Sequence, residues 1–261
     1  MDVVILCGGK GTRLSEETVI KPKPMVEIGG LPILLHIMNI YSFFGHNRFI
    51  LALGYKSDYI KQYFYNRKIT NGDMRIKLNP DENIEYLSNS NEKEWDITLI
   101  DTGLEATKSE RINKIEKYVH TENFHLTYGD GVSNVDIEQL IKFHKNHGKV
   151  GTVTAVHPPS RFGRLSINED TGIDFDEKSQ MIDEFINGGF FVFNKNLFKL
   201  LKTLSNLGKD FEFGILKFLS NENELMAFKH SGFWQCMDNV RERDYLHKLI
   251  IKNEAPWIRR Y

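Results

Sequence analysis

The stretch VVILCGGKGTRL, residues 3–14, joins a short apolar run to three glycines in four positions and then to Arg13. The apolar run predicts a buried β-strand. Glycines directly after a strand allow backbone angles and close approaches that other residues forbid, so we expect a ligand to lie against this backbone. Lys10 and Arg13 indicate an anionic ligand, and exposed backbone N–H groups ahead of a helix bind phosphate. The stretch therefore predicts a strand that leads into a phosphate-binding loop.

The first half of the chain alternates strand-like and helix-like segments. The strand at 3–7 is followed by a helix-like stretch at 32–45, which begins with proline and ends with glycine, and then by a strand at 48–53. Such alternation is typical of α/β proteins, so we expect a mixed, mostly parallel sheet with helices on both faces in a Rossmann-like arrangement. The later segments of the same pattern are 57–66, 96–101, 109–119, 124–130 and 136–148.

The second half has a different rhythm. After Gly148 the strand-like segments follow one another more closely, and we expect this part to be more antiparallel and lid-like. Residues 67–95 are polar and irregular, which predicts an inserted hairpin or a flexible flap. The chain shows no repeat or Pro/Gly/Ser-rich linker, so we expect one domain over 1–261. The segments after Gly148 are strands at 151–157, 163–168 and 188–193 and helices at 196–204 and 212–220.

Composition excludes several classes of protein. The chain of 261 residues has 34 Lys and Arg against 35 Asp and Glu, a net charge of −1, so no general field attracts nucleic acid or anionic lipid. Its two cysteines, Cys7 and Cys236, exclude a disulfide framework and a CxxC metal pair. The apolar run after Met1 is too short for a signal peptide or a spanning helix. We expect a soluble, cytoplasmic protein with no nucleic-acid or membrane partner.

Two known phosphate motifs do not fit the glycine loop. The P-loop pattern cannot be drawn through GGKGTRL, and the dinucleotide fingerprint fails because Leu14 stands where a third glycine belongs. A plain tight turn remains the alternative. A second basic cluster, KPKPM at 21–25, favours anion binding, since its two prolines are predicted to hold Lys21 and Lys23 in a stiff, extended segment near the loop.

Two aspartates follow predicted strands. Asp130 ends LTYGD and Asp238 ends GFWQCMD, and ligands of open α/β sheets bind at the carboxyl ends of strands. Mg²⁺ needs only one or two protein carboxylates beside substrate phosphates, so this pair is a candidate metal site. The alternative for each is a turn residue or a helix N-cap. The histidines form no metal-binding motif, and we expect His36, His144 and His147 to be surface or packing residues.

Together, GGKGTRL and KPKPM resemble the signature of the sugar nucleotidyltransferases, which join a nucleoside triphosphate to a sugar 1-phosphate and release pyrophosphate. Six further stretches, spread over nearly the whole chain, are similar to the members of this family that use CTP and glucose 1-phosphate. They are EETVIKPKPMVEIGGLPILLHIM, TLIDTG, TYGDGV, PPSRFGRL, INGGFFVF and GFWQCMD.

The resemblance implies a Rossmann-like nucleotidyltransferase fold with a nucleotide-binding half at about 1–148. A smaller sugar-binding lid region and the C-terminal helices are expected in the other half, at about 149–261. It also implies cytidylyl transfer from CTP to α-D-glucose 1-phosphate, giving CDP-glucose and pyrophosphate for surface polysaccharide and dideoxysugar synthesis. Mg²⁺ is the implied cofactor, and a homo-oligomer is the implied assembly.

The resemblance assigns roles residue by residue. Arg13 and Lys23 are the implied catalytic residues, with Lys23 at the α-phosphate, and Asp130 and Asp238 are the implied Mg²⁺ ligands. Arg111 is placed at the cytosine, although SERINKIEKY alone favours an exposed helix arginine. The implied nucleotide-binding residues are Leu6, Gly8, Gly9, Gly11, Thr12, Arg13, Lys23, Thr102, Gly103, Arg111 and Gly129. The implied sugar-phosphate residues are Phe162, Gly163, Glu177, Lys178, Asn187 and Gly188.

Three alternatives stay open at this point. A related enzyme would use another pyrimidine nucleotide or another sugar phosphate, and the sequence separates these choices poorly. A non-catalytic nucleotide sensor would share the fold, but Arg13, Lys23, Asp130 and Asp238 argue for catalysis. A nucleotide-sugar reductase would need the dinucleotide fingerprint, which is missing.

Overall fold

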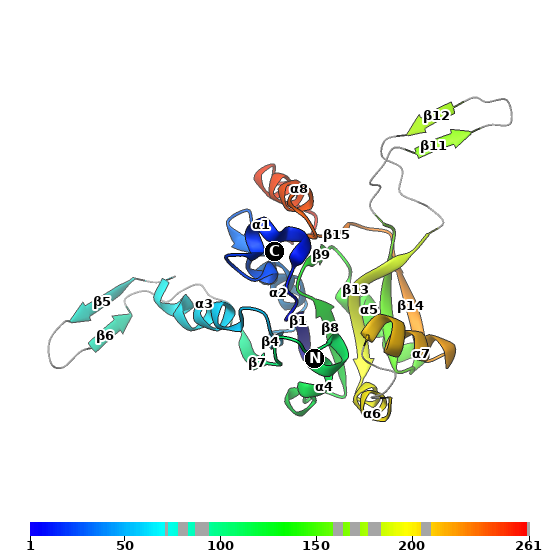
Figure 1. Cartoon of the computed structure of the whole chain (residues 1–261), viewed down its shortest axis with the longest axis horizontal. Helices are drawn as coiled ribbons and strands as arrows, with labels where there is room; N and C mark the ends of the chain where they lie inside the picture. Colours follow the sequence, from blue (N-terminus) through cyan, green and yellow to red (C-terminus); the bar gives the residue numbers. More distant parts are fainter. Residues whose placement is uncertain are drawn as a thin grey trace.

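A seven-stranded sheet forms the centre of the computed structural model, which describes residues 1–70, 73–77, 83–86, 94–158, 164–167, 173–176, 184–204 and 210–259 (Figure 1). The strand β1 (Val3–Cys7) lies inside the sheet and pairs in parallel with β4 and β8. β13 is antiparallel to both of its neighbours, whereas β10 and β14 pair in parallel. This confirms the predicted mixed, mostly parallel sheet. Its order is β14 (Leu225–His230), β10 (Gly151–Val156), β13 (Ile186–Asn194), β8 (Asn123–Tyr128), β1, β4 (Arg48–Leu53) and β7 (Asp96–Asp101).

Helices cover both faces of the sheet, as the apolar strands predict. Val3, Ile5 and Cys7 face a core that contains α2, α5 and α8, whereas Val4 and Leu6 face a second core with α4, α6 and α7. Successive residues of a strand point to opposite faces, so a strand covered on both sides is apolar throughout. The helices are α1 (Ser15–Thr18), α2 (Ile33–Phe43), α3 (Ser57–Thr70), α4 (Lys108–Lys114), α5 (Ile137–His147), α6 (Asn196–Thr203), α7 (Lys217–Asn221) and α8 (Val240–Ile251).

Local sequence sets the ends of the main helices. Pro32 precedes α2 with its φ fixed at −52°. α4 begins with a capping box, in which Thr107 and Glu110 each satisfy the other's backbone N–H. α5 is capped by Asp136 and ends at Gly148, whose φ of 65° suits glycine. Short 3₁₀ turns and one π-helix complete the helical segments: η1 (Thr12–Leu14), η2 (Lys23–Met25), η3 (Glu116–Tyr118) and the π-helical η4 (Phe211–Leu216).

Within the described ranges, four small strand pairs lie outside the main sheet. The region 67–95 contains the antiparallel pair of β5 (Met74–Lys77) and β6 (Asn83–Tyr86), which confirms the predicted inserted hairpin. Figure 1 shows this hairpin and the pair of β11 (Arg164–Ile167) and β12 (Ile173–Asp176) standing away from the sheet on opposite sides. The other pairs are β2 (Glu27–Ile28) with β3 (Leu31–Pro32), and β9 (Gly131–Ser133) with β15 (Trp234–Cys236).

The second half is only partly as predicted. β13 is antiparallel, but the edge strand β14 returns in parallel beside β10, and the sequence analysis did not identify β14. Its side chains are partly exposed along its length, so it lacks the continuous apolar run of the central strands. Among the helices that the structure describes, none is long and apolar enough to cross a membrane.

Two histidines at the end of α5 share one buried hydroxyl. The backbone N–H of Lys149 donates to His147 Nδ1 at 2.9 Å, and His147 Nε2 lies 2.7 Å from Thr152 Oγ1. Thr152 Oγ1 lies 2.9 Å from His144 Nδ1, and His144 Nε2 lies 3.3 Å from Asn123 Oδ1. A single arrangement of protons satisfies every group, with both rings neutral. The expectation of packing roles is confirmed for His144, which is buried.

The low pKa of His144 makes the free energy of unfolding depend on pH. Burial first, and then His147, lowers the pKa of His144 from 6.5 to about 4. The unfolded chain therefore binds more protons between these pKa values, and the free energy of unfolding falls as pH drops from about 6.5 to about 4, by at most about 1.4 kcal/mol per pH unit for this group. We expect His144→Gln to flatten this dependence in urea unfolding curves measured across that range. The exposed His120 provides the control: if His120→Gln flattens the dependence equally, His144 is not its source.

Candidate active site

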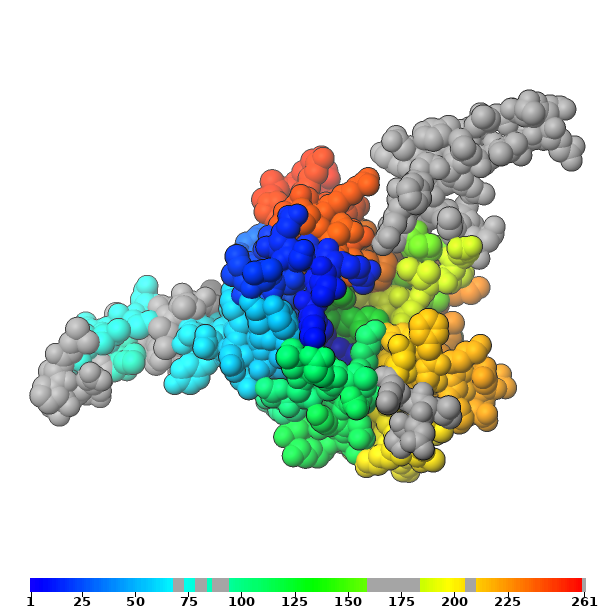
Figure 2. All heavy atoms as spheres, viewed as in Figure 1, coloured from blue at the N-terminus to red at the C-terminus, as the bar shows by residue number. Residues whose placement is uncertain are grey.

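A cavity of about 600 Å³ opens at the carboxyl ends of β1 and β8, the edge where the sequence predicts a ligand. Figure 2 shows the surface recessed here, between the blue N-terminal residues and the green and yellow strands. Its walls include most of the predicted nucleotide residues: Leu6, Gly8, Gly9, Gly11, Thr12, Arg13, Lys23, Arg111 and Gly129. Asp130, Asp238 and Gly188 also line it, so the structure brings both predicted aspartates to the phosphate loop.

The glycine loop forms one wall of the cavity. The backbone leaves β1 at Cys7 and turns through the 3₁₀ segment η1 into α1, a helix of only four residues. The predicted phosphate cradle therefore consists mainly of the loop itself rather than of a long helix. Lys10 pairs with the exposed Glu105 at 2.8 Å, and the largely exposed Arg13 reaches Asp238 at 2.8 Å.

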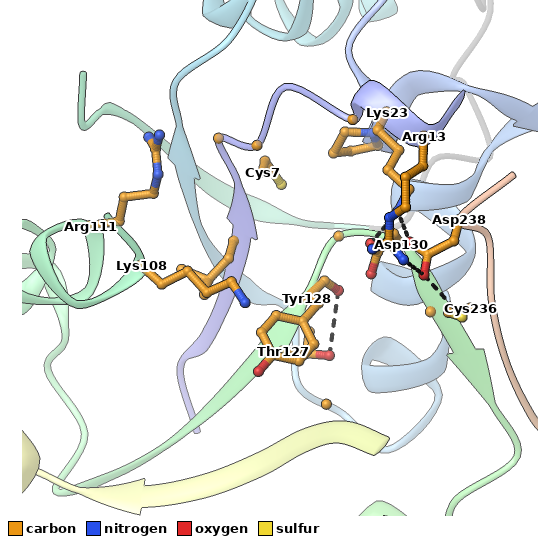
Figure 3. A pocket seen from close by; sticks show the side chains of 18 of the residues that line it. Cys7, Arg13, Lys23, Lys108, Arg111, Thr127, Tyr128, Asp130, Cys236 and Asp238 are labelled. Carbon is orange, nitrogen blue, oxygen red and sulfur yellow. Dashed lines mark hydrogen bonds and ion pairs between the residues drawn. The ribbon is translucent and has the colours of Figure 1, made fainter. Parts of the chain in front are cut away.

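Lys23 occupies a 3₁₀ turn, so the expected extended conformation of this residue was wrong. Pro22 is extended, with a ψ of 149°, but η2 begins at Lys23 and carries Pro24 in its first turn. A proline fits there because the first N–H groups of a helix have no intrahelical acceptor. The two prolines still fix the direction of Lys23, which points into the cavity (Figure 3).

The ammonium of Lys23 joins the two aspartates. Its Nζ donates to Asp130 Oδ2 at 2.5 Å and to Asp238 Oδ1 at 2.7 Å (Figure 3). Burial opposes the charge of Lys23, but the charges and hydrogen bonds of Asp130 and Asp238 outweigh it and raise the pKa of Lys23. Lys23 therefore contacts both partly buried carboxylates, which would otherwise repel each other, and Arg13 adds a second positive charge at Asp238.

A short antiparallel ladder places the two aspartates side by side. Gly131 of β9 pairs with Cys236 of β15, and the N–H of Met237 donates to the carbonyl of Asp130 at 2.8 Å. Asp130 and Asp238 therefore lie next to each other, at the same end of this ladder. The N-cap of α8 is Asn239, so the alternative of Asp238 as a helix cap was wrong.

The sequence analysis missed Glu242, which fixes the backbone of Asp238. Its Oε2 accepts the N–H of Asp238 at 2.6 Å, and its own N–H donates to Asn239 Oδ1 at 3.0 Å. The spacing of Asn239 and Glu242 is that of a capping box, which was the available signal.

The aspartate pair suits a hard divalent cation. Carboxylate oxygens of Asp130 and Asp238 both contact the ammonium of Lys23. Carboxylate oxygens are also the ligands that Mg²⁺ takes from proteins. Cys236 lies within reach of Asp238, but burial first, and then the neighbouring carboxylates, raises the pKa of its thiol to about 12. Burial also raises the pKa of the Cys7 thiol, so neither cysteine supplies a thiolate at neutral pH.

Arg111 is buried, which excludes its interpretation as an exposed helix arginine. Its guanidinium donates to the carbonyls of Leu53, Gly103 and Leu104 and to Thr102 Oγ1, at 2.6–3.1 Å. A Cβ atom on Gly8 would lie 2.2 Å from Arg111 Nη1, so this glycine is needed for contact with the arginine. Arg111 lines the cavity, and it connects Thr102 and Gly103 to the glycine loop.

The predicted sugar residues are only partly visible. Phe162, Gly163, Glu177 and Lys178 lie outside the described residues. Asn187 and Gly188 lie on β13, and the Gly188 carbonyl accepts from Trp234 Nε1 at 2.7 Å. Lys108, Tyr128 and Trp234 are among the cavity residues that were not predicted from the sequence. For Tyr128 a signal existed, because it directly precedes Gly129 and Asp130 at the strand end.

The chain is similar to known proteins in sequence and in fold. A sequence model described as nucleotidyl transferase matches residues 2–239. The glucose-1-phosphate cytidylyltransferases of Salmonella typhimurium and Salmonella typhi are each 46% identical over 98% of this chain and 98% of their own length. The solved structure of HddC from Yersinia pseudotuberculosis, complexed with GMP-PN, is 25% identical with a TM-score of 0.66, covering 95% of this chain and 99% of HddC.

The family match spans the glycine loop, Lys23 and both aspartates, and the Salmonella relatives match along nearly the entire chain. From these comparisons and this geometry, the chain belongs to the nucleotidyl transferase family.

Proposed function

We propose that this protein transfers a cytidylyl group from CTP to α-D-glucose 1-phosphate, giving CDP-glucose and pyrophosphate. The observation that carries the proposal is the convergence of Lys23, Asp130 and Asp238 beside the glycine loop, in a chain 46% identical to a Salmonella glucose-1-phosphate cytidylyltransferase. The absence of a thiolate at Cys7 and Cys236 favours direct attack by the sugar phosphate over a cysteine-linked intermediate.

The chemistry needs position and charge rather than a nucleophile from the protein. A sugar phosphate oxygen attacks the α-phosphorus of CTP, and pyrophosphate departs with the electrons of the broken P–O bond. Both reactants are anions, so cationic groups must be in place before they meet. In our assignment the loop N–H groups and Arg13 hold the departing pyrophosphate, and Lys23 contacts the α-phosphoryl oxygens.

Asp130 and Asp238 would hold Mg²⁺, which neutralises phosphate charge when bound. Lys23 links these two carboxylates in the free protein, so Mg²⁺ at the aspartate pair would replace its ammonium there and leave the ammonium for the adjacent α-phosphoryl oxygens. Arg13 contacts Asp238 from the loop side. The positive groups are therefore arranged before the substrates arrive, which is the condition for electrostatic catalysis.

Substrate selection is assigned to the two halves of the chain. We assign the nucleotide to about 1–148, with Thr102, Gly103 and Arg111 at the base, and the sugar phosphate to about 149–261, with Asn187 and Gly188 at the hydroxyls. Cytosine and uracil differ in donors and acceptors at one edge, so their discrimination requires fixed hydrogen-bonding groups. The proposal includes a cytoplasmic homo-oligomer that serves surface polysaccharide synthesis.

Another member of the family would use a different nucleotide or sugar phosphate in the same cavity. A non-catalytic nucleotide sensor would bind CTP without turnover. The intact set of Lys23, Asp130 and Asp238 supports catalysis over sensing.

We expect CTP, glucose 1-phosphate and Mg²⁺ together to yield pyrophosphate and a product with the mass of CDP-glucose. Excess EDTA should stop the reaction and added Mg²⁺ should restore it, because the aspartate pair is the proposed metal site. Equal turnover in EDTA would contradict the metal site. Binding of CTP without pyrophosphate release would instead favour the sensor.

Arg111 provides a test of nucleotide choice. We expect Arg111→Ala to raise the KM for CTP much more than the KM for glucose 1-phosphate and to reduce the preference for CTP over UTP. The reason is that four oxygen atoms in the segments proposed to hold the base lose their hydrogen-bond donor. Arg111→Lys should recover only part of the loss, because an ammonium cannot reproduce the guanidinium fork. Steady-state kinetics with both nucleotides measure this, and unchanged CTP kinetics in the alanine variant would remove Arg111 from base selection.

A further inference from the structure

A single carboxylate from the second half of the chain contacts two cleft residues of the first half. Glu212 Oε1 accepts the hydroxyl of Tyr128 at 2.7 Å and also pairs with Lys108 Nζ. Lys108 opens α4 on the nucleotide side, and Tyr128 ends β8 at the floor of the cavity. The side chains of Lys108 and Tyr128 both line the cavity (Figure 3), and Glu212 contacts both of them.

The fold fixes Glu212 at this place. It lies in η4, and π-helical turns occur frequently at functional sites. The preceding Phe211 is fully buried against the rings of Phe191 and Phe193, whereas the following Phe213 is 87% exposed. With Phe211 anchored in the core, the register of the turn leaves Glu212 half-buried at the cleft.

Tyr128 extends the contact to the sugar side. Asn187 Nδ2 donates to the Tyr128 hydroxyl at 3.2 Å, while Asn187 Oδ1 accepts the N–H of Gly189 at 2.9 Å. Gly189 has a φ of +76°, and a Cβ there would lie 2.5 Å from the Tyr128 ring, so backbone and ring fit closely. The hydroxyl that Glu212 orients therefore also orients the amide that we assign to the sugar.

Lys108 balances the charge of Glu212. Its Nζ lies 4.9 Å from the centre of the Tyr128 ring while it pairs with the carboxylate. A bare carboxylate behind the wall of a cavity that takes phosphates would repel them. The ion pair removes this repulsion and leaves the hydrogen bond of Tyr128 intact.

We propose that Glu212 is a positioning residue for the acceptor: its carboxylate fixes the Tyr128 phenol, and through it the Asn187 amide, where the sugar phosphate binds. This inference rests on the proposed function, because the sugar side of the cleft is assigned there.

The first test separates the two substrates. We expect Glu212→Ala and Tyr128→Phe each to raise the KM for glucose 1-phosphate about tenfold, the size expected for a lost hydrogen bond to a charged group, while the KM for CTP changes less than about twofold. The double variant should be no worse than the more damaging single variant, because both substitutions remove the same link. Phe213→Ala, on the same turn but exposed, is the matched control and should behave as wild type.

The second test uses the charge. Lys108→Met leaves the carboxylate unbalanced, so we expect the KM for glucose 1-phosphate to rise about threefold, and the addition of Glu212→Gln to reverse most of this rise. The side-chain amide that Glu212→Gln introduces keeps an oxygen that can accept the Tyr128 hydroxyl, which makes this the conservative variant.

Three results would overturn the positioning role. They are parallel increases in both KM values in the Glu212→Ala or Tyr128→Phe variant, multiplying effects when these two substitutions are combined, and no recovery in the Lys108→Met/Glu212→Gln variant. Melting temperatures of all variants would then show whether Glu212 only stabilises η4. If the wild type prefers another nucleotide and sugar phosphate, the proposed function is wrong. The role of Glu212 is then still tested by comparing how its variants change the KM for that sugar phosphate and the KM for that nucleotide.

Discussion

The ion pairs of Lys23 with Asp130 and Asp238 set the main constraint on this molecule. Two carboxylates held side by side in a partly buried cleft repel each other unless a cation lies between them. The fold places that cation at 2.5 and 2.7 Å from the two carboxylates by aiming η2 at the ends of β8 and β15. The segments that carry Lys23, Asp130 and Asp238 are far apart in the sequence. The parallel pairing of β1 with β8 and the small ladder of β9 with β15 bring them together.

This charge arrangement agrees with a reaction between anions. The cavity holds its positive groups against protein oxygens, with Arg13 on Asp238, Lys23 on both aspartates and Arg111 on backbone carbonyls at the end of β4 and after β7. Groups that already lie at the site need little reorganisation when phosphate charge develops, and electrostatic stabilisation of this kind is usually the largest single contribution to catalysis. The same logic extends to Glu212, whose negative charge is balanced by Lys108 before any substrate enters.

Much of the fold could be predicted because it follows from local patterns. Apolar runs such as 3–7 and the intervening helices predict a sheet covered on both faces, and the glycine loop and the two aspartates predict its functional edge. The edge strand β14 was not predicted because its partly exposed side chains show no clear alternation of apolar and polar residues. The burial of Arg111 depends on its contact with Leu53, and the position of Glu212 depends on its contact with Tyr128. These partners are distant in sequence, so no local pattern predicts the contacts.

The central claim is that Lys23 stabilises the α-phosphoryl group in the transition state. Steady-state kinetics of Lys23→Ala test it most directly, with Lys21→Ala as control, since Lys21 pairs with Glu27 rather than with the aspartates. We expect Lys23→Ala to lower kcat by about 10²-fold or more, with KM for CTP little changed and the fold intact by circular dichroism. A rise in KM alone, with kcat preserved, would show that Lys23 binds ground state and transition state equally and would contradict its role in the transition state.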